Sequence, residues 1–165
     1  MKTVYFVRHA KSSWDNPGLT DRERPLNQRG KRDAPFMAKL LKGQDVHPDK
    51  LVSSPANRAF TTASYFAEAF GLESADILVI QRIYEAYSDD LLDIIRHLSD
   101  EWNTILIFGH NPTFTEVVNR FSNNYIANIP TCGIERVDDS VERWRDFGSK
   151  AAGVKAFYYP KQYFE

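Results

Sequence analysis

Short apolar runs recur along the chain, and each has the length of a single strand. The clearest are Val4–Val7, Leu51–Ser53, Ile77–Ile80 and Thr104–Phe108. Runs of this length that are rich in β-branched and aromatic residues are typical of buried strands. The last third of the chain is less regular. There Gly133–Val137 and Gly153–Tyr159 are expected to add antiparallel strands at a sheet edge, with Trp144 in another short strand between them.

Helical periodicity fills the segments that separate these strands. We expect helices from Asn27 to between Leu41 and Gly43, from Ser54 to Gly71, from Ser88 to Leu98, and after Asn111. Ser54 and Asn111 have the side chains of N-caps, and each precedes a proline that suits the first helical position. Strands that alternate with helices predict an α/β fold: a single three-layer domain over residues 1–165, with a mainly parallel central sheet flanked by helices.

Composition and charge narrow the class of protein. The chain has 165 residues, 42% of them hydrophobic and 26% charged, which argues against disorder. A net charge of −1 gives no general attraction to nucleic acid or an anionic membrane, and no apolar run approaches the roughly 20 residues of a membrane span. Cys132 is the only cysteine and the first strand begins beside Met1, so we expect no disulfide, no signal peptide and a cytoplasmic location.

Basic or imidazole side chains follow three of the expected strands. Arg8 and His9 end the first strand, Arg58 lies in the first turn of the second helix, and His110 follows the strand Thr104–Phe108. Because parallel strands end at one edge of a sheet, these groups are expected to meet there and form an anion pocket. A phosphoryl group is the best match, since arginine binds phosphate oxygens in a bidentate manner.

The chemistry expected of this pocket is phosphoryl transfer through a covalent intermediate. A neutral imidazole can attack phosphorus directly, and His9 is the candidate nucleophile. Arg8, Arg58 and His110 would neutralise charge that develops on the transferred group, and Glu85 could protonate the leaving atom. A metal site at His9 and His110 is disfavoured, because no His-Glu-x-x-His motif is present and the arginines would repel the ion.

Other candidate residues have simpler structural interpretations. His47 and His97 are interpreted as surface residues, and Cys132 as a small buried side chain. Trp14 lies in the polar segment after the first strand. We expect it to close the end of the core, with a place in the wall of a binding cleft as the alternative.

The motifs that carry this chemistry resemble those of the histidine phosphatase superfamily, the phosphoglycerate mutase-like family. The matching segments are Arg8-His9-Ala10, where the family has Arg-His-Gly, then Ser53-Ser54-Pro55-x-x-Arg58-Ala59, Gly109-His110, and Asp21 to Leu26 followed by Gly30. Within the family, Arg8 to Trp14 and Gly109 to Pro112 are similar to the SixA-type phosphohistidine phosphatases. Asp15 stands where mutase-like members often carry Asn.

The resemblance implies a role for each of these residues. It implies His9 as the phosphorylated nucleophile, with Arg8, Arg58 and His110 as phosphate ligands and no metal or cofactor. Glu85 takes the place of the usual proton donor, with Asp89 and Asp90 as rivals.

The function expected is therefore a metal-independent phosphatase that acts through phospho-His9 on a phosphorylated protein, such as a phosphohistidine protein, or on a small phosphomonoester. Only Leu72 to Tyr84 separates the second helix from Glu85, too short a piece to form a lid over the pocket, which suits a phosphate on a protein surface. The alternatives are a small-molecule phosphomonoesterase and a phosphate-recognition module that binds phosphoproteins with little turnover.

Overall fold

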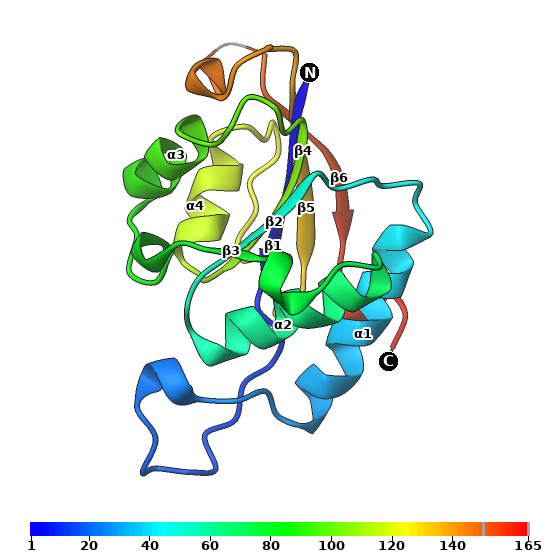
Figure 1. Cartoon of the computed structure of the whole chain (residues 1–165), viewed down its shortest axis with the longest axis vertical. Helices are drawn as coiled ribbons and strands as arrows, with labels where there is room; N and C mark the ends of the chain where they lie inside the picture. The colour runs from blue at the N-terminus through cyan, green and yellow to red at the C-terminus, as the bar shows by residue number, and fades with distance from the viewer. Residues whose placement is uncertain (150, 165) are drawn as a thin grey trace.

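A computed structural model, which describes residues 1–149 and 151–164, contains one six-stranded sheet. The strands are β1 (Lys2–Arg8), β2 (Lys50–Ser53), β3 (Leu78–Val79), β4 (Thr104–Gly109), β5 (Ile134–Asp139) and β6 (Gly153–Tyr158), in the spatial order β3-β2-β4-β1-β5-β6. The first four in this order are parallel, and β5 and β6 add to them in antiparallel fashion. The predicted α/β fold with a mainly parallel sheet is confirmed (Figure 1).

Two pairs of helices cover the two faces of the sheet. On one face lie α1 (Gln28–Lys42) and α2 (Asn57–Ala69), and on the other lie α3 (Ser88–Arg96) and α4 (Thr113–Asn119) (Figure 1). Alternate residues of β1 point to opposite sides: Val4 and Phe6 pack with α3 and α4, whereas Tyr5 and Val7 pack with α1 and α2. A strand covered on both faces needs a continuous apolar run, which is what the sequence contains.

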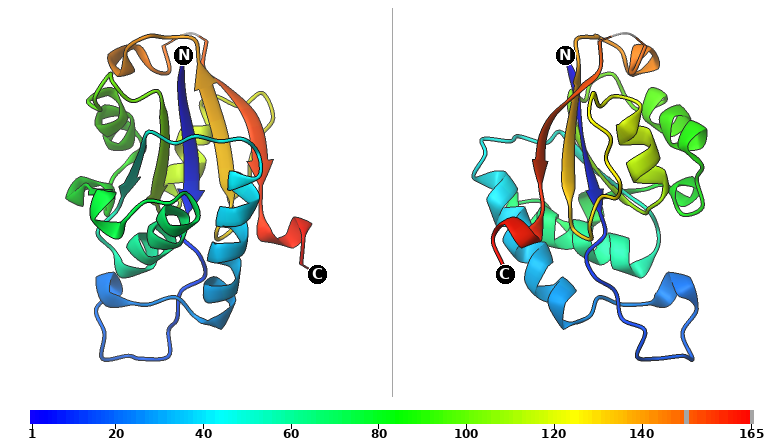
Figure 2. Two further views of the ribbon diagram at one scale, coloured as in Figure 1. Left: turned by 45° about the vertical axis from the view of Figure 1, so that its right-hand side comes forward. Right: turned by 180° about the vertical axis from the view of Figure 1, so that it is seen from behind.

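The strand register places the ends of the three central parallel strands in one row. Arg8 of β1 pairs with Gly109 of β4, and Phe108 pairs with Ser53 of β2. The ladder continues one step beyond, because the amide of His9 donates to the carbonyl of Gly109 at 3.0 Å. Two views of the ribbon show the long segment between β1 and α1 running below this edge (Figure 2). The residues after β1, β2 and β4 therefore meet at one edge of the sheet.

Two of the predicted helix starts are wrong, by two residues for α2 and by one for α4. Ser54 does not cap α2, because its amide still donates to the carbonyl of Phe108 at 3.0 Å and so remains in the sheet; Ala56 is the N-cap. Asn111 is not the N-cap of α4, which has Pro112 in that position and starts at Thr113. In contrast, Asn27 caps α1 as predicted, accepting a bond from the amide of Gly30 at 2.9 Å.

Both tryptophan predictions are wrong. Trp14 does not close the core, because its side chain is 73% exposed and Arg24 stacks 3.2 Å above its ring. Trp144 lies in a 3₁₀ helix, η4 (Trp144–Asp146), instead of a strand, and is fully buried with its indole N–H donating to the carbonyl of Trp102 at 2.8 Å. One buried tryptophan fits a helical turn as well as a strand, so the local pattern could not distinguish them.

The remaining differences concern the lengths of β3 and α3. The third strand is only Leu78–Val79, because it pairs with just two residues of β2, and α3 ends at Arg96. No helix within residues 1–149 and 151–164 is long and apolar enough to cross a membrane.

Candidate active site

His9 follows β1 directly and lies at the edge of the sheet where the central strands end. Its side chain is nearly buried, and Nδ1 lies 2.8 Å from the carbonyl oxygen of Ala10. A carbonyl only accepts, so Nδ1 carries the proton of the neutral ring and Nε2 keeps a free lone pair. Burial lowers the pKa of His9 to about 3, with the charges of Arg58 and Arg8 adding to this effect and the Ala10 bond opposing it. At neutral pH the ring is therefore uncharged.

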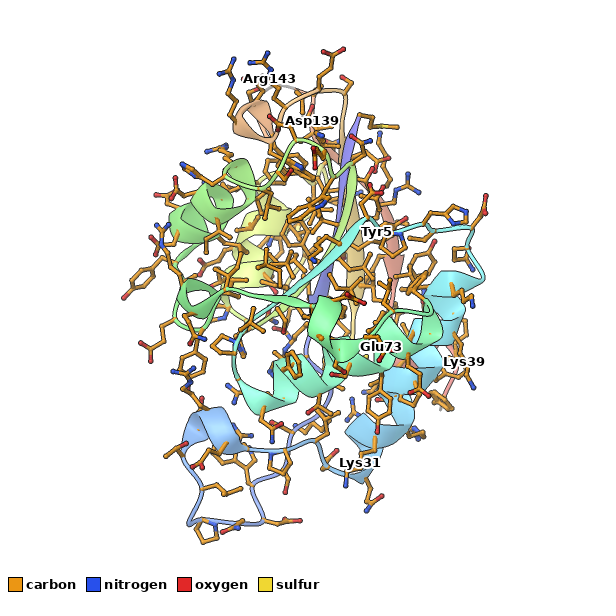
Figure 3. The ribbon with its side chains drawn as sticks, in the orientation of Figure 1. Tyr5, Lys31, Lys39, Glu73, Asp139 and Arg143 are labelled. Carbon is orange, nitrogen blue, oxygen red and sulfur yellow. The ribbon has the colours of Figure 1, made fainter. Side chains whose placement is uncertain are left out.

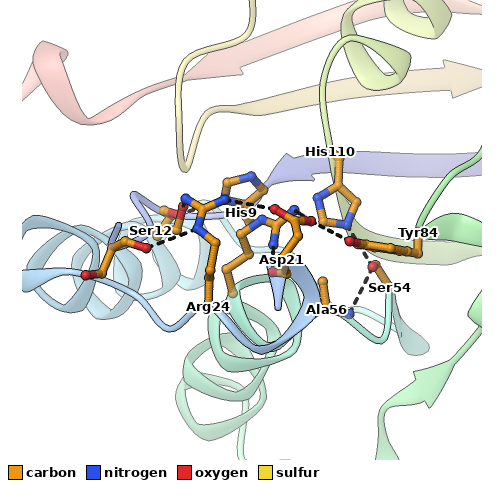
Figure 4. Close-up of polar contacts among 11 residues, drawn as sticks. His9, Ser12, Asp21, Arg24, Ser54, Ala56, Tyr84 and His110 are labelled. Carbon is orange, nitrogen blue, oxygen red and sulfur yellow. Dashed lines mark hydrogen bonds and ion pairs between the residues drawn. The ribbon is translucent and has the colours of Figure 1, made fainter. Parts of the chain in front are cut away.

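His110 follows β4 and faces His9 across the edge of the sheet (Figure 4). The two ring centroids are 5.3 Å apart. Nε2 of His110 lies 2.8 Å from the hydroxyl of Ser54, whereas Nδ1 is buried with no hydrogen-bond partner among the described residues. Burial, together with the charge of Arg58, lowers the pKa of His110 to about 4. Two neutral imidazoles thus stand side by side.

Arg58, the second residue of α2, reaches the same place and is held there by the loop after β1. Its Nη1 donates to the carbonyl of Asp21 at 2.7 Å and its Nη2 to the Asp21 carboxylate at 3.0 Å. The side chain is only 9% exposed. A cation in the first turn of a helix is unfavourable by itself, and the Asp21 carboxylate compensates the charge of Arg58 there.

Asp21 is a member of the site that the sequence analysis did not identify. Its carboxylate accepts from Arg58, from Arg24 at 3.0 Å, and from the hydroxyl of Tyr84, which contacts His110 edge-on at 5.7 Å between ring centroids (Figure 4). Burial opposes ionisation, but the bonds from Tyr84, Arg58 and Arg24 lower the pKa of Asp21 to about 2. The site therefore contains a permanent negative charge beside its cations.

The only sign of Asp21 in the sequence is its place in the segment that resembles the family. Its neighbours are typical of a turn, and its partner Tyr84 lies 63 residues further along the chain. The sequence likewise predicts Ser54 as a helix cap, whereas its hydroxyl lies 2.8 Å from Nε2 of His110.

Arg8 is the last residue of β1 and directly precedes His9. Its Nη1 donates to the carbonyl of Ile129 at 2.9 Å, and its Nε is buried without a partner in the described part of the chain. The guanidinium is near enough to lower the pKa values of both His9 and His110. The structure therefore brings together four of the five predicted site residues.

Glu85, the fifth, lies at the margin. It is exposed and lines a cavity of about 290 Å³ together with His110 and Tyr84, but no hydrogen bond or ion pair of its side chain is present among the described residues. The two rivals are paired elsewhere, Asp89 with Arg120 at 2.8 Å and Asp90 with Arg82 at 3.0 Å. Glu85 therefore shares a cavity with His110, whereas the lining of that cavity includes neither Asp89 nor Asp90.

The remaining titratable residues behave as structural or surface groups. His47 and His97 are exposed, and Cys132 is completely buried, which raises the pKa of its thiol. Across residues 1–149 and 151–164, no three His, Cys, Asp or Glu side chains are grouped so that they could hold a metal ion. The side chains that meet at the site carry imidazole, guanidinium, hydroxyl and carboxylate groups, which can bind an oxyanion and attack with an unprotonated nitrogen.

Comparison with known proteins agrees with this chemistry. Residues 4–88 match the Histidine phosphatase superfamily (branch 1). An uncharacterised protein from Mycobacterium leprae is 30% identical over 167 residues, which cover 94% of this chain and 100% of that protein.

Solved structures show the same fold at nearly full length. A protein from Agrobacterium tumefaciens, provisionally named phosphohistidine phosphatase SixA, is 28% identical with a TM-score of 0.81 over 96% of this chain and 98% of that one. The protein histidine phosphatase SixA in complex with tungstate has a TM-score of 0.81 at 21% identity and covers 97% of this chain and 98% of that one, a likeness of fold. Since the family match includes Arg8, His9 and Arg58, the chain belongs to the histidine phosphatase superfamily and is an enzyme of the phosphatase class with a SixA-like fold.

Proposed function

We propose that the protein hydrolyses phosphohistidine on other proteins through a phosphohistidine intermediate on His9. The observation that carries the proposal is the geometry of His9: the Ala10 carbonyl holds the proton on Nδ1 and leaves Nε2 free, in a ring that burial keeps neutral. An unprotonated nitrogen at the floor of a cationic site is what attack on a phosphoryl group requires. The likeness to the Agrobacterium tumefaciens protein provisionally named phosphohistidine phosphatase supports the choice of substrate.

The reaction takes two displacements at phosphorus. In the first, Nε2 of His9 forms a bond to phosphorus while the bond from phosphorus to the substrate nitrogen breaks, and that nitrogen takes up a proton. In the second, water attacks phosphorus, the bond to Nε2 breaks, and the water proton passes to solvent or phosphate. The lone pair of Nε2 is restored, so the enzyme returns to its starting state.

Arg8, Arg58 and His110 are proposed to stabilise the phosphoryl oxygens during both steps. The guanidinium groups supply charge-assisted donors, and such donors are most effective in a site that excludes water. We assign the proton of neutral His110 to Nδ1, with the Ser54 hydroxyl donating to Nε2. The buried Nδ1 without a partner then becomes a donor to a phosphoryl oxygen.

Glu85 remains our proposal for the proton donor. A phosphohistidine substrate makes a modest demand on a proton donor, because a departing imidazole is itself basic near neutral pH. A phosphate ester has a far more basic leaving oxygen, so the donor should matter most for esters.

The open edge of the site favours a protein as the substrate. Residues 72–84, which are too short a segment to form a lid, contain β3, which is hydrogen-bonded to β2 at the edge of the sheet. We therefore propose a phosphorylated protein surface as the substrate and treat residues 1–165 as one histidine phosphatase domain that works without metal or cofactor. The buried free thiol of Cys132 is compatible with the cytoplasm as its location.

The decisive experiment is transfer of labelled phosphate to the protein from a phosphohistidine peptide. We expect an acid-labile, base-stable label that is absent in His9→Ala, with turnover reduced on the order of 10⁴-fold or more, as when other covalent nucleophiles are removed. His97→Ala, which removes an exposed histidine, serves as the control and should keep both label and activity. Label that persists in His9→Ala would exclude His9 as the nucleophile.

The same assay separates the two alternatives. Faster turnover of small phosphomonoesters than of phosphohistidine peptides would indicate a small-molecule phosphomonoesterase. Saturable binding of vanadate with negligible hydrolysis of every substrate would indicate a phosphate-recognition module. Activity that survives a chelator is expected for either kind of phosphatase.

A further inference from the structure

A second cavity lies beside the candidate active site and shares Arg8 with it. Its volume is about 450 Å³, within the range of sites that hold a small ligand or a few side chains. All its charged lining residues are cations: Arg8, Lys11, Arg29 and Lys161. The chain as a whole has 21 Lys and Arg against 22 Asp and Glu. A cavity lined by four cations and no acid therefore differs strongly from this overall balance of charges.

These cations come from separate parts of the chain. Arg8 ends β1, Lys11 lies in the loop that follows, Arg29 is in the first turn of α1, and Lys161 belongs to the 3₁₀ helix η5 (Pro160–Gln162). The C-terminal segment is held beside α1 by aromatic contacts of Phe36 with Tyr163 and Phe164, and Figure 2 shows the two lying together. The cavity is thus built by tertiary packing and is not a run of basic residues in the sequence.

The cations available in the cavity are incompletely neutralised. Arg8 donates only to a backbone carbonyl, and neither Arg8 nor Lys11 forms an ion pair within the described residues. Arg29 shares the buried carboxylate of Asp33 with Arg32, at 3.4 Å and 2.8 Å respectively. A buried, unpartnered donor such as Arg8 Nε is unfavourable unless a ligand satisfies it.

One wall of the cavity is aromatic. Phe157 and Tyr159 stack on each other with ring centroids 4.7 Å apart, and both line the cavity. Aromatic rings give apolar contact for the methylene groups of a peptide, while the cations bind its carboxylates. Spread charges and an aromatic wall fit an acidic polypeptide better than one compact anion.

We propose that this cavity docks an acidic segment of the protein substrate, next to the phosphorylated residue that enters the active site. The inference rests on the proposed function, because Arg8 joins the two sites and a bound peptide would run from one to the other. The near-neutral chain has no general attraction to polyanions, so nucleic acid is the less favoured ligand. The cavity would act on substrate binding and leave the chemical steps unchanged.

The test compares two phosphohistidine peptides that differ only in three flanking residues, Glu in one and Gln in the other. Wild-type protein should favour the acidic peptide by about 5- to 20-fold in kcat/KM, mainly through KM, and salt raised from about 50 to 300 mM should reduce the preference. The double variant Lys11→Gln, Lys161→Gln should lose it. The control Lys31→Gln, Lys39→Gln removes two charges from the exposed side of α1, labelled in Figure 3, and should keep it.

Inorganic phosphoramidate, which has no flanking residues, separates the two proposals. Every lysine variant should hydrolyse it at the wild-type rate, and this result upholds the proposed chemistry even if docking fails. Equal rates of wild-type protein on the two peptides would overturn the docking proposal, as would an equal loss of the preference for the acidic peptide in both double variants. A slower reaction of the Lys11 and Lys161 variant with phosphoramidate would overturn it too. Competition by a single-stranded oligonucleotide that depends on the same two lysines would reassign the cavity to nucleic acid.

Discussion

At the scale of single residues, the site is governed by how burial and neighbours set protonation. His9 and His110 are kept neutral by desolvation and nearby arginines, whereas Asp21 is kept ionised by three donors. A nucleophile must be unprotonated and an oxyanion site must be cationic, and the two conditions support each other here. The arginine charges that attract phosphate also disfavour a proton on His9.

The pH dependence of kcat/KM for a phosphate ester reports this effect. An ordinary imidazole would lose its lone pair near pH 6.5. Since the pKa of His110 is about 4 and that of His9 about 3, both imidazoles should stay neutral as pH falls from 7 to about 5, and the nucleophile should be lost only near pH 3. After correction for the substrate phosphate, which ionises near pH 6, no acid limb should remain above about pH 5. A remaining inflection near 6.5 would show that His9 is solvated.

Asp21 should weaken the binding of anions to the resting enzyme. Asp21→Asn keeps the shape and the acceptor oxygen but removes one negative charge, so we expect orthovanadate to bind about 3- to 10-fold more tightly. Titration calorimetry or inhibition of turnover measures this change. As the control, Asp15→Asn also removes one negative charge, but at an exposed position of the same loop, and should have little effect on vanadate binding. Weaker binding to Asp21→Asn would mean that ordering of Arg58 outweighs repulsion.

At the scale of elements, the contact between β4 and α4 positions His110. Gly109 ends β4 beside the ring of Phe114 in α4, and a methyl group there would lie 2.6 Å from that ring. Phe114 is buried and packs edge-on against Phe6 of β1 at 5.6 Å between centroids. The close approach of strand and helix therefore depends on the missing side chain of Gly109.

Gly109→Ala should lower both stability and activity. Overpacking of this kind is expected to decrease the free energy of unfolding by about 1–3 kcal/mol, measured by urea denaturation, and to displace the neighbouring His110. In Gly153→Ala, a methyl group at the start of β6 would approach Lys155 no closer than 3.8 Å, so stability should stay within about 0.5 kcal/mol. Equal stability of the two variants would show that Phe114 can move aside.

At the scale of the whole molecule, positive and negative side chains are unevenly distributed, although the net charge is close to zero. Cations gather at the edge where β1, β2 and β4 end, while an unpartnered acid is buried within the sheet. Glu135 of β5 is 1% exposed, and its Oε2 has no hydrogen-bond partner among the described residues. Burial raises the pKa of Glu135 to about 7.

This acid makes the stability of the whole fold depend on pH. Between about pH 4.5 and 7 the folded chain retains a proton that the unfolded chain releases, so the free energy of unfolding falls as pH rises. Glu135→Gln removes this fall and should be more stable than wild type by about 1–3 kcal/mol at pH 8, with little difference at pH 4. Urea denaturation at several pH values measures it, with the exposed Glu142→Gln as control. A constant difference across pH would contradict the assignment.

The sequence by itself determined the alternation of strands and helices, the parallel centre of the sheet, and the three strand ends near which Arg8, His9, Arg58 and His110 lie. These are consequences of local order: apolar runs bury strands, a period near 3.6 buries helices, and parallel strands bring their ends to one edge. The family motifs lie on the same turns, which is why four of the five predicted site residues meet.

Tertiary structure alone decided what surrounds these residues. Asp21 accepts hydrogen bonds from Arg58 and Tyr84, and the Ser54 hydroxyl contacts His110 instead of capping a helix. Trp14 is exposed to solvent. The cavity beside Arg8 forms where the C-terminal segment packs against α1. Each of these contacts joins loops or termini that are distant in the chain. No periodicity encodes the path of a loop, because its residues are not constrained by a repeating hydrogen-bond pattern, and only the packed fold determines which side chains it brings together.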